Sequence, residues 1–261
     1  MSVYWRERIV SLPKIWKALK PPAPQIEPAQ WRQVEARLPF LQRLSAPESA
    51  QLHQLALHFI ATKEWYGAHG LQLTDEMQLT IALQACLPVL HLGLQWYQGW
   101  VGIIVYPGDF VIPRSVMDGD GVVHEFDDTV LGEAWEGGPV LLSWFDDADA
   151  VDGVNIVIHE FAHKLDMNKG VADGMPPLHP GMSAPQWRAA LAPAYDDFCR
   201  RVDEGEDTLL DPYGAESPAE FFAVMSESFF EVPDLLYQEY PLVYRQLAQF
   251  YRQDPNHTAA C

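Results

Sequence analysis

One stretch, Val154–Asp166, most constrains what this chain can fold into, because it contains the pattern His-Glu-Phe-Ala-His at 159–163. Residues four apart lie one above the other on a helix, so His159 and His163 can both reach one ion, with Glu160 beside it. The apolar residues recur at the spacing of an amphipathic helix, and they are Val154, Val157, Ile158, Phe161, Ala162 and Leu165. The stretch therefore predicts a helix that carries a zinc site.

A second, polar stripe on the same helix consists of Asn155, His159, His163 and Asp166, and it indicates that the helix lines a cleft. Asp166 lies one turn beyond His163, where it could accept the second N–H of a ligand histidine and fix the tautomer of that ring. The alternative is a pair of core histidines beside an exposed Glu160. The phase of the helix and the position of Asp166 both favour the metal site.

Length and composition are those of a globular protein. The 261 residues, 48% hydrophobic and 20% charged, suffice for one large domain or two small ones. No apolar run reaches the roughly 18 residues that span a bilayer, so we expect no membrane span. A formal net charge of −19 argues against direct binding to DNA or RNA. It suits cationic or amine-bearing substrates, although a solubilising surface is its commoner meaning.

The N-terminus differs from the rest of the chain. Five basic residues there alternate with apolar ones, and the stiff linker Pro21-Pro22-Ala23-Pro24 follows. The segment lacks the apolar core of a secretory signal, and Pro13 interrupts any membrane-surface helix. We expect residues 1–25 to form an arm and linker, and residues 26–261 to form a single domain. Within it we expect a helical part over about 26–98 and a catalytic core over about 99–254.

The three cysteines are an odd number at unrelated spacings, so no disulfide framework or cysteine zinc knuckle is expected. This usage predicts a reducing cytoplasm. The cysteines are Cys86, Cys199 and Cys261.

The order of predicted elements is helix, strand, helix, which favours an α+β fold with a small mixed or antiparallel sheet. Ser45 and Glu48 form a capping box that starts one helix, and Thr74 caps a second that ends near Pro88. Strands are predicted at 100–106, 110–112, 122–126 and 140–144.

The last predicted strand, 140–144, precedes the acidic loop Asp146–Asp152 and then the metal helix. We expect it to be an edge strand that could pair with an extended peptide and hold it over the metal. Gly170–Pro185 is expected to form a wall or lid of the cleft. Further helices are predicted at 186–202, at 221–230 after the N-cap Ser217, and at 242–252.

A catalytic zinc needs a third protein ligand. The extended pattern H-E-x-x-H-x-x-G-x-x-H is absent, because Asp166 stands in place of the glycine and Lys169 in place of the third histidine. Glu220 would open an apolar helix, but a capping box with Ser217 also explains its position, so spacing alone leaves the ligand open. The candidates are Asp173, His179, Glu220 and Glu227.

Four blocks of sequence occur in order: L-P-V-L-H-L-G-L at 87–94, H-E-F-A-H-K-L-D at 159–166, D-P-Y at 211–213 and S-P-A-E-F-F-A-V at 217–224. In these blocks, and from about Leu38 to Asp254, the chain resembles the Mlc titration factor A family. The resemblance implies a cytoplasmic, zincin-like metallopeptidase with aminopeptidase activity and a catalytic core similar to that of anthrax lethal factor. The family is named for binding the repressor Mlc, so the resemblance implies a DNA-binding repressor as a second partner beside a peptide substrate.

The resemblance also implies roles for individual residues. The family's third ligand falls on Glu220, and its active-site tyrosine, seven residues earlier, falls on Tyr213. In the implied mechanism Glu160 is the general base, and Tyr213 donates a hydrogen bond to the developing oxyanion. Asp166 and Glu227 are candidates for holding the ligand histidines in place. The ligands of a single Zn²⁺ would be His159, His163 and Glu220.

A rival hypothesis from a different class is a non-catalytic regulatory protein that sequesters a transcription factor and uses the zinc site only as an accessory. Glu160 separates the two, because a protein that only binds has no need of a general base beside its metal. We therefore predict a zinc-dependent peptidase of the aminopeptidase type, which does not contact nucleic acid directly.

Overall fold

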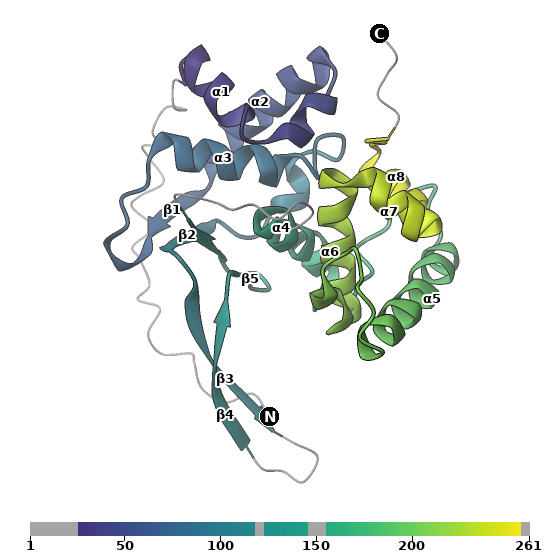
Figure 1. The fold of residues 1–261 in the computed structure, drawn as a ribbon. Coiled ribbons are helices and arrows are strands. Elements are labelled where there is room, and N and C mark those ends of the chain that lie inside the picture. Colours follow the sequence, from purple (N-terminus) through teal and green to yellow (C-terminus); the bar gives the residue numbers. More distant parts are fainter. Residues whose placement is uncertain (1–25, 118–122, 146–154, 257–261) are drawn as a thin grey trace.

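The computed structural model describes residues 26–117, 123–145 and 155–256. The predicted basic arm, the acidic loop Asp146–Asp152 and the last five residues lie outside these ranges. Within them the chain is α+β, as predicted, with helices at both ends of the sequence and strands between them (Figure 1).

The N-terminal part consists mainly of three helices: α1 (Pro28–Glu35), α2 (Ala46–Thr62) and α3 (Asp75–Cys86). The predicted helix starts are confirmed. Ser45 and Glu48 form both bonds of a capping box at α2, and the Thr74 hydroxyl accepts from the N–H of Met77 at α3. The sequence analysis missed α1, which is only eight residues long and has a single buried side chain, Val34.

The main sheet has four strands in the order β1 (Glu64–Gly67), β2 (Gly102–Pro107), β6 (Val140–Trp144) and β5 (Gly132–Ala134). The first three are parallel, and β5 is antiparallel to β6. The sheet is therefore small and mixed, as expected. The prediction that 140–144 is an edge strand was wrong, because β5 folds back on it and takes the edge. With only three residues, β5 has no periodic pattern that could be read from sequence.

Strands β3 (Phe110–Met117) and β4 (Val123–Val130) form a separate antiparallel hairpin. It projects away from the helices in Figure 1. Both strands continue beyond their predicted ends at 112 and 126. Pro113 and the charged residues after it interrupt the apolar pattern, but backbone pairing continues through them, with Pro113 opposite Asp127.

The C-terminal part contains α4 (Ile156–Asp166), α5 (Ala184–Asp203), α6 (Pro218–Glu231), α7 (Pro233–Glu239) and α8 (Pro241–Tyr251). Each of the last four has a proline in its first two positions, where the missing N–H would have no helical partner. No helix among the described residues is both long and apolar enough to cross a membrane.

Helix α4 lies at the centre of the molecule, between the N-terminal helices, the sheet and α6 (Figure 1). Its apolar face enters an aromatic cluster in which Phe161 contacts the rings of Phe59, Tyr97 and Trp100. Its other face is also buried, since His159 and His163 are both less than a tenth exposed. A helix buried on both sides holds its polar side chains in a fixed position.

Candidate metal centre

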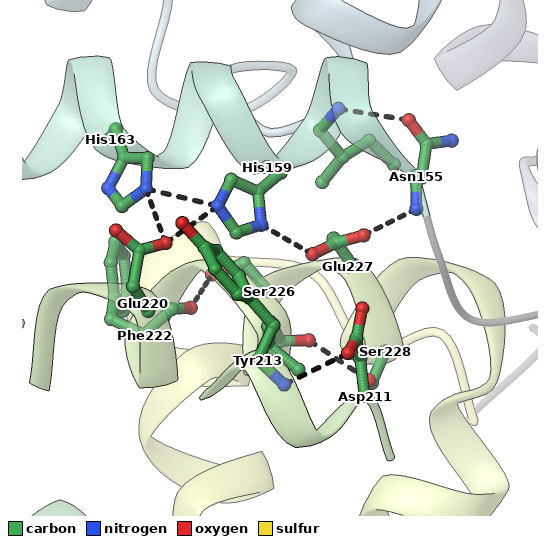
Figure 2. Close-up of polar contacts among 12 residues, drawn as sticks. Asn155, His159, His163, Asp211, Tyr213, Glu220, Phe222, Ser226, Glu227 and Ser228 are labelled. Atoms are coloured by element: carbon green, nitrogen blue, oxygen red, sulfur yellow. Dashed lines mark hydrogen bonds and ion pairs between the residues drawn. The ribbon is translucent and has the colours of Figure 1, made fainter. Parts of the chain in front are cut away.

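Three potential metal-binding side chains converge between α4 and α6 (Figure 2). Glu220 Oε2 lies 2.9 Å from His159 Nε2 and 3.1 Å from His163 Nε2, and the two nitrogens lie 3.1 Å apart. Ligands of a tetrahedral zinc ion at about 2.1 Å are about 3.4 Å from one another, so the three atoms have nearly the spacing that one ion requires. Two histidines and a glutamate also form a donor set found in catalytic zinc sites.

The start of α6 explains how Glu220 reaches the histidines. The Ser217 hydroxyl caps the helix by accepting from the backbone N–H of Glu220 at 3.2 Å. The carboxylate of Glu220 turns toward the histidines of α4 rather than back to Ser217. The cap is therefore made without the Glu220 side chain, which remains available to a metal ion.

A second glutamate of α6 contacts His159 at Nδ1, the ring nitrogen that does not face Glu220. Glu227 is buried, and its Oε1 lies 2.6 Å from Nδ1 of His159. Its other oxygen accepts the backbone N–H of Asn155, the N-cap of α4. The Asn155 side chain donates to Gln84 and Glu231, each at 2.7 Å. This network directs Nε2 of His159 at Glu220, as carboxylates behind metal-bound histidines do.

Asp166 does not make the predicted hydrogen bond to a histidine. It is fully buried, and its Oδ2 accepts the backbone N–H groups of Asp173 and Gly174 at 2.9 and 2.7 Å. Nδ1 of His163 has no hydrogen-bond partner in the described part of the chain. Asp166 therefore anchors the loop after α4 through two backbone hydrogen bonds.

Glu160 lies beside the cluster, only 3% exposed, and its Oε2 has no hydrogen-bond partner among the described residues. Burial raises the pKa of its carboxyl group to about 7, against the opposing charges of the two histidines. Strand β5 covers it closely: a Cβ atom built on Gly132 would lie 2.6 Å from Oε1 of Glu160. Only glycine lets the strand pass so near.

Hydrogen bonds with neighbouring side chains shift the pKa values of Glu220 and His159. Burial raises the pKa of Glu220, but hydrogen bonds with His159 and His163 outweigh it and lower that pKa to about 2. Burial lowers the pKa of His159, but hydrogen bonds with Glu220 and Glu227 outweigh it and raise that pKa well above its usual value. The carboxylates thus stabilise positive charge at the point where the ligand atoms meet.

Tyr213 lies at the mouth of the site and is 51% exposed. It belongs to the short helix η6 (Pro212–Ala215), which begins where Asp211 accepts the Tyr213 backbone N–H at 3.0 Å. Its ring centre lies 5.9 Å from that of His159, and its hydroxyl end points toward the histidines in Figure 2. This placement is compatible with a donor to substrate.

A cavity of about 590 Å³ opens over these groups. Strand β5 forms one wall and η6 and the start of α6 form another. Among the described residues that line it, the carboxylic acids outnumber the bases, which are the two histidines, and none is Lys or Arg. These acids are Glu133, Glu160, Asp211, Glu220 and Glu227. The cavity is therefore electrically suited to a positively charged or amine-bearing molecule.

A family model for the glucose-regulated metallopeptidase M90 matches residues 14–252. The chain belongs to the M90 metallopeptidase family. It is similar to proteins named Mlc titration factor A. The one from Yersinia enterocolitica is 41% identical over 246 residues, which cover 92% of this chain and 91% of the relative. The one from Yersinia pestis is 40% identical over 246 residues, covering 92% and 90%. The family resemblance inferred from the four sequence blocks is confirmed.

Asp173 and His179, two of the alternatives predicted for the third metal ligand, do not belong to the cluster of His159, His163 and Glu220. Asp173 is more than half exposed and pairs with Lys169 at 3.2 Å. His179 lies over Phe250, and its Nε2 is 3.0 Å from the carbonyl of Gln249. Both side chains help to hold the 170–183 loop in place.

Sequence reasoning also missed parts of the M90 site. Gly132, Asn155 and Gln84 were not recognised as supporting residues. A glycine followed by Glu-Ala carries no signal of a buried contact, and Gln84 lies 71 positions before Asn155. A hint was present at Asn155, because asparagine just before an apolar periodic run is a typical N-cap.

Proposed function

We propose that the chain is a zinc-dependent peptidase that holds one Zn²⁺ per chain with His159, His163 and Glu220. The observation that carries the proposal is the convergence of the three ligand atoms beside the buried carboxyl group of Glu160, whose Oε2 has no hydrogen-bond partner among the described residues. A bound zinc ion would supply Lewis acidity and lower the pKa of a water molecule to about 7.

The residues of the chain supply the remaining chemistry. Glu160 takes the proton of the attacking water and passes it to the leaving amine, a role for which a pKa near neutrality is well matched. Tyr213 donates its hydroxyl proton in a hydrogen bond to the oxyanion that develops on the scissile carbonyl. Glu227 keeps the His159 ring oriented throughout.

We further propose an aminopeptidase acting on peptides with a free amino terminus. The acidic lining of the cavity supports this specificity, and β5 lies at the edge of the four-stranded sheet, where a peptide backbone could run beside it. We place the enzyme in the cytoplasm. The free thiols of Cys86 and Cys199 agree with a reducing compartment.

The test combines metal analysis with hydrolysis of paired peptide amides, one of each pair with a free amino terminus and the other acetylated. We expect about one zinc per chain, cleavage of the free peptides only, and loss of activity with a chelator. Glu160→Gln should keep zinc but lose about 10²–10⁴-fold in rate. Glu204→Gln, on the exposed end of α5, is the matched control. Near-full activity of Glu160→Gln would exclude the mechanism, and cleavage of acetylated peptides would exclude the specificity.

A second proposed function is binding of a repressor of the Mlc type. The observation in its favour is 41% identity to a protein named Mlc titration factor A. The test is co-purification of the chain with such a repressor, using wild type and Glu160→Gln. Equal binding by both, together with a wild type that cleaves no peptide, would favour the non-catalytic alternative.

A further inference from the structure

Lys164, the residue after the ligand candidate His163, is unusual because it is only 3% exposed. Its ammonium group donates to two main-chain carbonyls, that of Trp135 at 2.5 Å and that of Gly138 at 2.8 Å. It also lies 4.7 Å from the centre of the Trp100 ring. A lysine has three donors, so one side chain can serve both carbonyls at once.

Both carbonyls belong to the tight turn that joins β5 to β6. The turn is closed by the Trp135 N–H, which donates to Pro139 at 3.1 Å, and by the Gly138 N–H, which donates to Trp135 at 2.9 Å. Lys164 therefore ties the metal helix α4 to the turn that folds β5 back onto the sheet. Deleting this tie would remove a charged donor from both carbonyls, and that of Trp135 would keep only the Gly138 N–H among the described residues.

The other end of β5 also rests on α4. There the backbone of Gly132 passes so close that an added Cβ would lie 2.6 Å from Glu160 Oε1 and 2.8 Å from Ile156 Cγ1. This three-residue strand is the last in the sheet order and pairs with β6. Its distance from the metal helix is thus set at two points, Glu160 at one end and Lys164 at the other.

We propose that Lys164 is a positioning residue, which holds β5 at a fixed height above Glu160 and thereby sets where a peptide backbone lies relative to the metal. The inference deepens the proposed peptidase function and rests on it. Lys164 itself does not touch the substrate. Its effect is on the binding of the peptide, through the strand, rather than on the chemistry at Glu160.

Lys63 provides a matched control, because it makes the same contacts elsewhere. Its ammonium donates to the carbonyls of Tyr97 and Trp100, each at 2.8 Å, and lies 3.5 Å from the centre of the same Trp100 ring. It ties the end of α2 to the segment before β2, and it does not line the cavity. A purely structural role of a lysine that donates to two main-chain carbonyls should thus give the same result at both positions.

The experiment compares Lys164→Met, Lys63→Met and wild type as full-length zinc-loaded protein. Methionine keeps an unbranched stem but removes the donors. We expect Lys164→Met to keep its zinc and a kcat near the wild-type value, while KM for an extended peptide rises about ten-fold, as loss of a charged hydrogen bond would produce. Amide hydrogen exchange should accelerate at residues 132–138 in this variant only. Lys164→Arg, which restores donors, should recover part of the KM.

Wild-type exchange at 132–138 in Lys164→Met would overturn the inference, and so would an unchanged KM. Equal changes of KM in both methionine variants would reduce Lys164 to a general structural role and would also overturn it. If Lys164→Met does not fold, Lys164→Gln, which is shorter and keeps one donor group, repeats the comparison. If wild type cleaves no peptide, the proposed function fails, and the exchange data alone decide whether Lys164 holds β5.

Discussion

Replacement of Gly132 by alanine tests how closely the edge strand covers the proposed general base. The added Cβ would lie 2.6 Å from Oε1 and 2.7 Å from Cγ of Glu160, and 2.8 Å from Cγ1 of Ile156. Non-bonded carbon atoms rest about 3.5–4.0 Å apart, so relief requires a shift of about 1 Å. Glu160 is buried, and either its side chain or β5 must move.

The expected loss follows from this displacement. Moving a catalytic group by about 1 Å can cost about 10²-fold in rate, so we expect kcat to fall by about that factor. Overpacking should also lower the free energy of unfolding by about 1–3 kcal/mol. Zinc content should not change, because the three ligand candidates lie on α4 and α6 rather than on β5.

The assay measures kcat and KM on a peptide with a free amino terminus, zinc per chain, and unfolding in urea. Gly102→Ala is the matched control. Gly102 lies in the same sheet, and its added Cβ would meet Pro139 Cβ at 3.2 Å, away from Glu160. Wild-type values of both kcat and KM in Gly132→Ala would refute the close packing of β5 on Glu160. Loss of zinc would show that the effect arises at the metal and not at the base.

Three further predictions concern the metal helix and its partners. His159→Ala and His163→Ala should each lose zinc and activity, since two ligands hold zinc poorly, and full metal occupancy in either would contradict the site. Glu227→Gln should lose about 10–100-fold in zinc affinity, because Glu227 no longer orients the His159 ring. Glu220→Gln should lose more, since it removes a ligand. A metal titration that gives the reverse order would make Glu227 the ligand. Asp166→Asn should keep zinc but lower the free energy of unfolding by about 1–3 kcal/mol, measured in urea, because Oδ2 anchors two backbone N–H groups. Unchanged stability would show that the anchor is unimportant.

The sequence identified the longer helices and most of their starts, which depend on neighbours along the chain. The period of apolar residues identified α4 and directed His159 and His163 to one face, because a helix brings residues four apart together. Capping residues identified the starts of α2, α3 and α6 for the same local reason. Family resemblance, rather than spacing, selected Glu220 from the possible third ligands.

Tertiary structure alone decided which distant side chains complete the site. Glu227 meets His159 across 68 positions, and no local pattern encodes that pairing. Strand β5 takes the sheet edge because the turn at Gly138 reverses the chain and Lys164 holds that turn, although three residues are too few to show a period. Asp166, which sequence placed beside a histidine, instead binds the loop N–H groups that packing brings to it. Helix contacts are local and repeat along the chain, whereas contacts between elements depend on how the whole chain packs.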